Sequence, residues 1–213
     1  MQRYLFSLIF VFLFSACRGI YDASDLQINN NPLMPLAVGN YWTYGAEIPD
    51  SLTWSVDSVI NYTYQNTQLN LYLVNLHSGW LSSSAYYFYK NGALYQCSPE
   101  AFEPDHPVYL FRYPVRTGEQ WTNEIFFLGS PGEIDYYTCL SKTVSLSVTA
   151  GTFTCYDYKV DKYLMVSASV LYSEHFYFTP GIGLIARKTI RIADNKETDL
   201  PISQQRLTDY KIH

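Results

Sequence analysis

Hydrophobic and polar residues alternate along much of the chain beyond Pro35. The alternation is clear in residues 52–57, 144–148 and 156–160, where apolar side chains occupy every second position. A period of two is typical of a strand that buries one face and exposes the other. About eleven such strands can be placed, with no helix longer than a turn or two after the N-terminus, so the pattern predicts an all-β protein with an antiparallel sheet.

Two short segments between these strands have the composition of tight turns. Residues 149–152 (Thr-Ala-Gly-Thr) separate two alternating segments, and Asn91-Gly92 separates two aromatic ones. Glycine and asparagine adopt positive φ at low cost, as two-residue hairpin turns require. Both segments therefore predict hairpins between neighbouring strands.

A repeat divides the β region into two halves, about 35–113 and 114–192. Residues 35–43 and 114–122 share the pattern P-x-x-x-G-x-x-W-T, and an aromatic hairpin at 87–94 is similar to one at 176–184. Each half is too small to close its own apolar face, so the halves must pack together. The sequence predicts one domain over 35–213, either an antiparallel sandwich or a curled, barrel-like sheet.

Aromatic residues are more frequent than charged ones, at 17% against 15% of the chain. Charged residues alone make up roughly a quarter of a typical soluble domain. The aromatic side chains singled out are the two repeated tryptophans and three tyrosines of the aromatic hairpins: Trp42, Trp121, Tyr87, Tyr89 and Tyr177. Core packing is the first interpretation of these residues and ligand binding is the alternative.

The N-terminus has the layout of a secretory signal. Arg3 precedes an apolar run over residues 5–14, which is followed by the small residues Ser15 and Ala16 and then by Cys17. A run of this length is too short to span a membrane as a helix, which takes about 20 apolar residues. Residues 1–16 are therefore predicted to be a signal helix that is removed on export.

Ser15-Ala16-Cys17 resembles the lipobox of bacterial lipoproteins, in which cleavage precedes a cysteine that receives a diacylglycerol. Phe14 stands where the motif usually has an aliphatic residue, so ordinary signal cleavage is the alternative. The resemblance implies lipidation of Cys17, attachment to the membrane with palmitate-type acyl chains, and, from the absence of Asp after the cysteine, the outer membrane. Residues 17–34 would then form the lipidated cysteine and a polar tether.

Three further cysteines, Cys97, Cys139 and Cys155, follow in the β region. At most one disulfide can form among three thiols, and the sequence does not decide whether one does. No C-x-x-C pair occurs, which excludes the common zinc-ribbon and thioredoxin-type motifs.

Catalytic and metal-binding motifs are missing from the sequence. It contains no G-x-S-x-G or S-x-x-K, and its four histidines show neither H-E-x-x-H nor H-x-H spacing. Glu174-His175 is the best acid–base candidate, but adjacent residues of a strand point to opposite faces, so the two would not act together. A net charge of −5 without a basic patch argues against nucleic-acid binding. We expect no catalytic residue, no metal and no cofactor.

Three segments of the chain resemble a family of uncharacterised bacterial lipoproteins. These are residues 35–44 (PLAVGNYWTY), 150–155 (AGTFTC) and 177–185 (YFTPGIGLI). The resemblance implies export and a β-rich fold, and it supplies no activity and no catalytic residues.

Three functions are compatible with these observations. The first is a lipid-anchored cell-envelope β-domain with a non-enzymatic binding or structural role, with the membrane and an envelope protein as partners. The second is a carrier of a lipid or other apolar ligand in a barrel-like cavity. The third is a hydrolase of envelope glycans, which would require paired carboxylates in a cleft. The first interpretation is preferred because the search for catalytic motifs finds none.

Overall fold

The computed structural model describes residues 31–46, 51–64, 66–79, 81–97, 108–127, 130–164, 169–193 and 196–213. The predicted signal and Cys17 lie outside these residues. The described part is all-β, with twelve strands instead of about eleven: β1 (Tyr41–Ala46), β2 (Leu52–Tyr64), β3 (Thr67–Ser78), β4 (Leu81–Lys90), β5 (Ala93–Cys97), β6 (Val108–Arg112), β7 (Gln120–Phe127), β8 (Ser130–Val148), β9 (Gly151–Leu164), β10 (Ser169–Thr179), β11 (Gly183–Ala193) and β12 (Lys196–Lys211). No helix within these ranges is long and apolar enough to cross a membrane.

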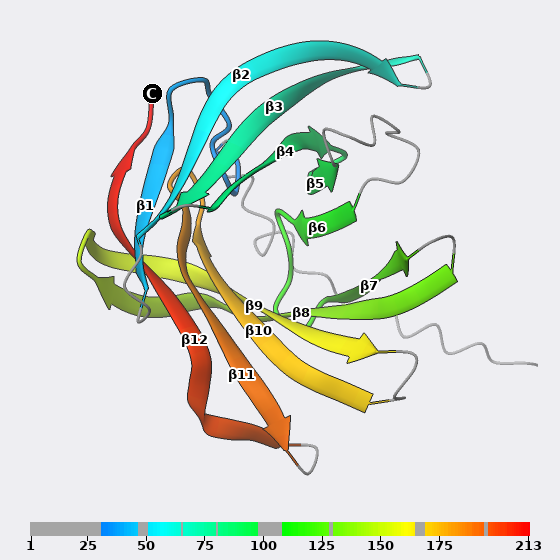
Figure 1. Ribbon diagram of the computed structural model, residues 1–213, viewed down its shortest axis with the longest axis vertical. Helices are drawn as coiled ribbons and strands as arrows, with labels where there is room; N and C mark the ends of the chain where they lie inside the picture. Colours follow the sequence, from blue (N-terminus) through cyan, green and yellow to red (C-terminus); the bar gives the residue numbers. More distant parts are fainter. Residues whose placement is uncertain are drawn as a thin grey trace, which may run out of the picture.

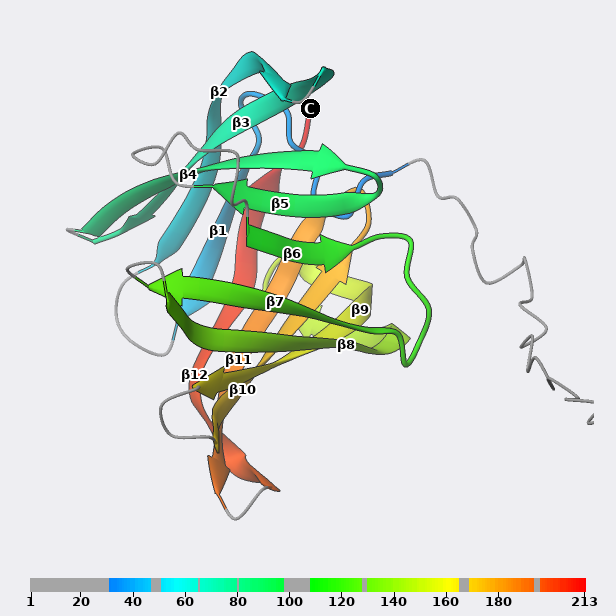
Figure 2. The same cartoon turned by 90° about the vertical axis from the view of Figure 1, so that its right-hand side faces the viewer.

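All twelve strands belong to one antiparallel sheet in the order β6-β5-β4-β3-β2-β1-β12-β11-β10-β9-β8-β7. Each half of the chain forms a six-stranded meander, and the pairing of β1 with β12 joins the two. The sheet curls until its edge strands, β6 and β7, lie side by side (Figures 1 and 2). Of the two predicted architectures, the structure therefore adopts the curled, nearly closed barrel.

Side chains join the two edges where no backbone ladder links β6 to β7. Trp121 on β7 donates its indole N–H to the Leu110 carbonyl oxygen of β6 at 3.3 Å, and its ring centroid lies 6.0 Å from that of Tyr109. An ion pair of 3.1 Å joins Arg112 of β6 to Glu119, just before β7. The barrel is thus closed at this seam by side-chain contacts.

Both predicted turns form. Asn91 and Gly92 have φ of 51° and 74° between β4 and β5, and Gly151 has φ of 141° at the turn from β8 to β9. A non-glycine side chain at positive φ is strained, although asparagine tolerates it well. The residues that tolerate positive φ therefore determine where the chain turns between the strands of these hairpins.

The repeated P-x-x-x-G-x-x-W-T segments adopt the same local structure. Gly39 donates its N–H to the Val56 carbonyl oxygen of β2 at 2.9 Å, and Gly118 donates to the Cys139 carbonyl oxygen of β8 at 2.7 Å. Both glycines have positive φ, 92° and 81°. Trp42 lies in β1 and Trp121 lies in β7, and each of these is the first strand of its meander. The two aromatic hairpins are β4–β5 and β10–β11. The sequence repeat therefore occupies equivalent positions in the two halves.

The segment before β1 packs inside one end of the barrel. Leu33 and Met34 are buried, at 0% and 1% exposure. The Tyr89 hydroxyl makes two hydrogen bonds to the Met34 backbone: it accepts from the N–H at 2.8 Å and donates to the carbonyl oxygen at 2.9 Å. Leu33 and Met34 lie within the predicted tether, residues 17–34, but their apolar side chains fill the core and make them part of the packed domain.

Candidate functional site

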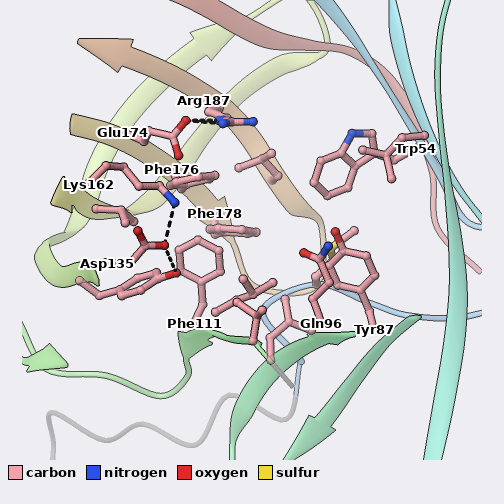
Figure 3. Close-up of a pocket in the computed structure, with 18 residues that line it drawn as sticks. Trp54, Tyr87, Gln96, Phe111, Asp135, Lys162, Glu174, Phe176, Phe178 and Arg187 are labelled. Atoms are coloured by element: carbon pink, nitrogen blue, oxygen red, sulfur yellow. Dashed lines mark hydrogen bonds and ion pairs between the residues drawn. The ribbon is translucent and has the colours of Figure 1, made fainter. Parts of the chain in front are cut away.

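A cavity of about 390 Å³ lies in the interior of the barrel (Figure 3). Residues from β2, β3, β4, β5 and β6 line one part of it, and residues from β8, β9, β10 and β11 line the rest. Small-molecule sites in proteins occupy roughly 300–1,000 Å³ and combine an apolar lining with a few polar groups. The cavity has this size and this composition.

Aromatic and aliphatic side chains share the apolar lining. Trp54 and Tyr87 lie on one side, with ring centroids 6.3 Å apart. Phe111 packs against Phe176 and Phe178, with centroid separations of 5.0 and 4.8 Å. These side chains alternate with outward-facing residues along their strands, so the pleat directs them to the interior.

A first charged cluster lies on β8 and β9, on the side away from Trp54 (Figure 3). Lys162 Nζ lies 2.7 Å from Asp135 Oδ2 and 3.1 Å from Glu133 Oε1. The Tyr137 hydroxyl donates to the same Asp135 oxygen at 3.2 Å. Asp135 and Lys162 are opposed in the β8–β9 ladder, which brings the carboxylate and the ammonium together.

Burial governs the protonation of this cluster. It raises the pKa of Asp135 to about 6, and neighbouring Glu133 adds to the rise while Lys162 opposes it. Burial also lowers the pKa of Lys162, but the charges and hydrogen bonds of Asp135 and Glu133 outweigh it and raise that pKa overall. Lys162 therefore remains a cation, whereas Asp135 releases its proton around pH 6 instead of around pH 4.

A second charged cluster lies on β10 and β11. Arg187 donates from Nε to Glu174 Oε1 at 3.1 Å, and it also donates from Nη2 to that oxygen. Thr189 Oγ1 donates to the same oxygen at 3.4 Å. The guanidinium carbon of Arg187 lies 5.2 Å from the ring centroid of Phe176, its partner in the ladder. The carboxylate and the ring together fix the orientation of the guanidinium.

The predicted aromatic residues divide between the core and the cavity. Of the five, Tyr87 lines the cavity. Trp42 is fully buried and donates to the Ile182 carbonyl oxygen, while Trp121 lies in the seam between β6 and β7. Tyr89 holds Met34.

Tyr177 is buried on the face of β10 that points away from the cavity, and its ring stacks on that of His175 with a centroid separation of 6.2 Å. His175 Nδ1 lies 3.0 Å from Asp157, and its Nε2 lies 3.5 Å from Glu197. Its neighbour Glu174 points into the barrel toward Arg187. The prediction that Glu174 and His175 face opposite ways is confirmed.

The three cysteines of the domain are free and buried, so Cys97, Cys139 and Cys155 form no disulfide with one another. Burial raises the pKa of each thiol, to about 12 for Cys139. Within the described residues, no group of three or more His, Cys, Asp or Glu side chains converges as metal ligands would.

Trp54 and three of the four charged residues of the cavity, Asp135, Lys162 and Arg187, are absent from the sequence-based candidates. The alternation over residues 52–57 predicts that Trp54 is buried, but nothing in that pattern indicates a binding site. Asp135, Lys162 and Arg187 carry no local motif, because each meets its partner across a ladder. A charged residue at an inward position of an alternating strand is the one pattern that would have indicated them.

No family model matches the chain. No curated protein matches it either. Among solved structures, the chain is similar to a Bacteroides fragilis protein named as exported and as having a YmcC-like fold. The TM-score is 0.55 at 14% identity, over 85% of this chain and 100% of the other. A Parabacteroides distasonis protein named as a lipoprotein gives a TM-score of 0.49 at 14% identity, over 85% of this chain and 99% of the other. The likeness to the B. fragilis protein shows a shared barrel-like fold.

Proposed function

We propose that this protein is a lipid-anchored component of the bacterial cell envelope that binds a small ligand, part apolar and part polar, inside its barrel. The observation that carries the proposal is the cavity of about 390 Å³, whose aromatic lining faces two charged clusters. Interiors of proteins are normally filled at the density of organic crystals, so a space of this size needs an explanation. A bound molecule supplies one.

The lining matches a ligand of mixed character. Trp54, Tyr87 and Phe178 offer apolar surface, whereas Lys162 and Arg187 offer charge. Buried charges are costly, and pairing with carboxylates lowers that cost without filling the cavity. A purely structural barrel would be expected to place apolar side chains at these inward positions.

The envelope location rests on the N-terminal residues. An apolar run followed by Ser15-Ala16-Cys17 supports export and acylation of Cys17. The structurally similar B. fragilis protein is named as exported, which agrees with this location. We further propose that the anchor lies in the outer membrane.

Native mass spectrometry of the full-length protein, purified from its own envelope, tests the binding function. We expect a bound small molecule that leaves on mild activation. Leu76 lines the cavity, so Leu76→Trp is expected to occupy the space and remove the bound species.

Ile202→Trp provides the matched control. Ile202 lies on β12 with 54% of its surface exposed, and the same large side chain there leaves the interior unchanged. Retention of the ligand by Ile202→Trp and its loss from Leu76→Trp would support the proposal. An empty wild-type protein, or a ligand that both variants keep, would contradict it.

A further inference from the structure

We propose that Arg187 is the residue that binds the ligand, and that the ligand is a small amphiphile with an anionic head group. This inference rests on the proposed binding function and specifies the chemistry of the ligand. It follows from the placement of the four charged side chains that line the cavity: Asp135, Lys162, Glu174 and Arg187.

Exposure determines which of these charges a ligand would meet. The side chain of Arg187 is 35% exposed, compared with 16% for Lys162, 6% for Glu174 and 2% for Asp135. The carboxylates are thus covered by the wall, and the cations are nearer to the open space. Of the four side chains, that of Arg187 is therefore the most accessible to a ligand.

The guanidinium of Arg187 retains unused donors. It carries five N–H groups, and Glu174 Oε1 is the acceptor of its hydrogen bonds to described residues, through Nε and Nη2. Its Nη1 group extends away from Glu174, on the side of the cavity where Trp54 lies (Figure 3). Gln205, the β12 partner of Arg187 in the ladder, has a buried amide oxygen without a partner among the described residues and accepts nothing from it.

Glu174 acts as a positioning residue for this donor. It holds the Nε edge of the guanidinium, and the ring of Phe176 supports one face at 5.2 Å. Thr189 donates to the same carboxylate oxygen, and Ser203 donates to Thr189 at 3.2 Å. Because these contacts already fix the Arg187 side chain, it loses little conformational entropy when a ligand binds, which favours affinity.

The remaining surroundings favour an anionic head with an apolar body. A carboxylate or phosphate accepts two parallel N–H bonds from a guanidinium, a geometry that a cation cannot use. Lys162 also lines the cavity, but Asp135 and Glu133 already pair with its ammonium group, which leaves Arg187 as the cation with free donors among the described residues. Phe178, Leu94 and Trp54 surround the rest of the space and would contact the apolar body.

Three probes with one alkyl chain and different heads test this inference: decanoate, decanol and decylamine. Binding is measured by equilibrium dialysis of each labelled probe against the full-length protein in lipid nanodiscs, with empty nanodiscs as the blank for partitioning. We expect decanoate to bind at least about tenfold more tightly than the other two, as an added charge-assisted contact implies. Decanol reports on the cavity without the head-group contact.

Variants then separate the head-group contact from the cavity. Arg187→Gln is expected to reduce decanoate affinity by about tenfold or more and to leave decanol affinity unchanged. Arg206→Gln, at an exposed position of β12, is the matched control and is expected to leave both unchanged. Arg187→Lys retains a cation beside Glu174. It serves as the second variant if Arg187→Gln fails to fold, and we expect decanoate affinity between those of wild type and decanol.

The outcomes are distinguishable. Tighter binding of decylamine, or unchanged decanoate binding in Arg187→Gln and Arg187→Lys, would overturn the anionic class while decanol binding still supported the cavity function. Failure of all three probes to bind, together with a protein that carries no ligand from its envelope, would overturn both proposals.

Discussion

The indole N–H of Trp42 donates to the carbonyl oxygen of Ile182 at 2.6 Å, which joins the first strand of one half to the aromatic hairpin of the other. The two residues belong to separate motifs of the sequence and come together only because β1 pairs with β12. Trp42 is fully buried, so this bond is shielded from water. The contact makes the turn after β10 part of the domain core.

Replacement of Trp42 by Phe is expected to destabilise the protein by about 2 kcal/mol or more, because it leaves a void and an unpaired carbonyl. Trp54→Phe is the matched control, since the indole N–H of Trp54 has no partner among the described residues. We expect it to cost less than about 1 kcal/mol. Urea unfolding measures both, and equal losses would contradict the role given to the Trp42 hydrogen bond.

Gly183 is expected to tolerate no side chain. Its φ is 110°, and a Cβ there would lie 3.0 Å from Trp42 Nε1. Gly118 has a similar φ of 81° with open space around a Cβ, so Gly118→Ala isolates the conformational cost, about 1 kcal/mol. We expect Gly183→Ala to cost more than this in thermal or urea unfolding.

The close contact between a Cβ at position 183 and the indole of Trp42 can be tested by removing the indole. Phenylalanine lacks the atom nearest to the added methyl group, so Gly183→Ala should cost less in the Trp42→Phe background than in the wild type. Strictly additive effects would show that the two residues do not interact through this contact.

Asp135 is expected to make stability depend on pH. Because its pKa in the folded protein is about 6, above the ordinary 3.8, the folded state binds more protons than the unfolded chain between these values. Stability from this group is therefore present below about pH 4 and is lost as pH rises toward about 6. Asp135→Asn lacks this titration, so its stability relative to wild type should improve by on the order of 1 kcal/mol from about pH 4.5 to pH 7.

Asp209→Asn is the control for this measurement, because Asp209 is exposed on β12. Urea unfolding at about pH 4.5 and at pH 7 gives the free energy of unfolding of each variant relative to wild type. If Asp135→Asn shows the same difference from wild type at both, the carboxyl does not titrate in this window.

The buried thiols are expected to be inert in the native protein. Cys139 and Cys155 are fully buried, Cys97 is 8% exposed, and burial raises the pKa of all three thiols. Thiolate is the reactive form, so a water-soluble thiol reagent at neutral pH should modify none of them rapidly. All three should react once the chain is unfolded without a reductant. A lower thiol count in denaturant would reveal a disulfide.

Lipidation of Cys17 is tested by metabolic labelling with a fatty acid. We expect label in the wild type and in Cys97→Ser, and none in Cys17→Ala, since a single thiol receives the diacylglycerol. Label that persists in Cys17→Ala would place the acyl chain elsewhere. A wild type without label would favour ordinary signal cleavage.

The sequence by itself determined the strands, the hairpins and the equivalence of the two halves. Alternation over residues 52–57 and 156–160, the positive φ available at Gly92, and the glycine before each repeated tryptophan are local properties, and the structure uses each as expected. The shared face of the inward residues also follows, because apolar residues at every second position of a strand lie on the same face of the sheet.

Only the tertiary structure decided where the cavity and its two charged clusters lie. Asp135 and Lys162 are 27 residues apart, and Glu174 and Arg187 are 13 apart, so no spacing in the sequence relates them. Asp135 and Lys162 meet because they are directly opposed in the β8–β9 ladder, whereas Glu174 and Arg187 are diagonal neighbours on β10 and β11. The curl of the sheet brings both pairs and Trp54 into the lining of one cavity. Register and curvature depend on the packing of all twelve strands together, whereas a sequence pattern reports on one strand at a time.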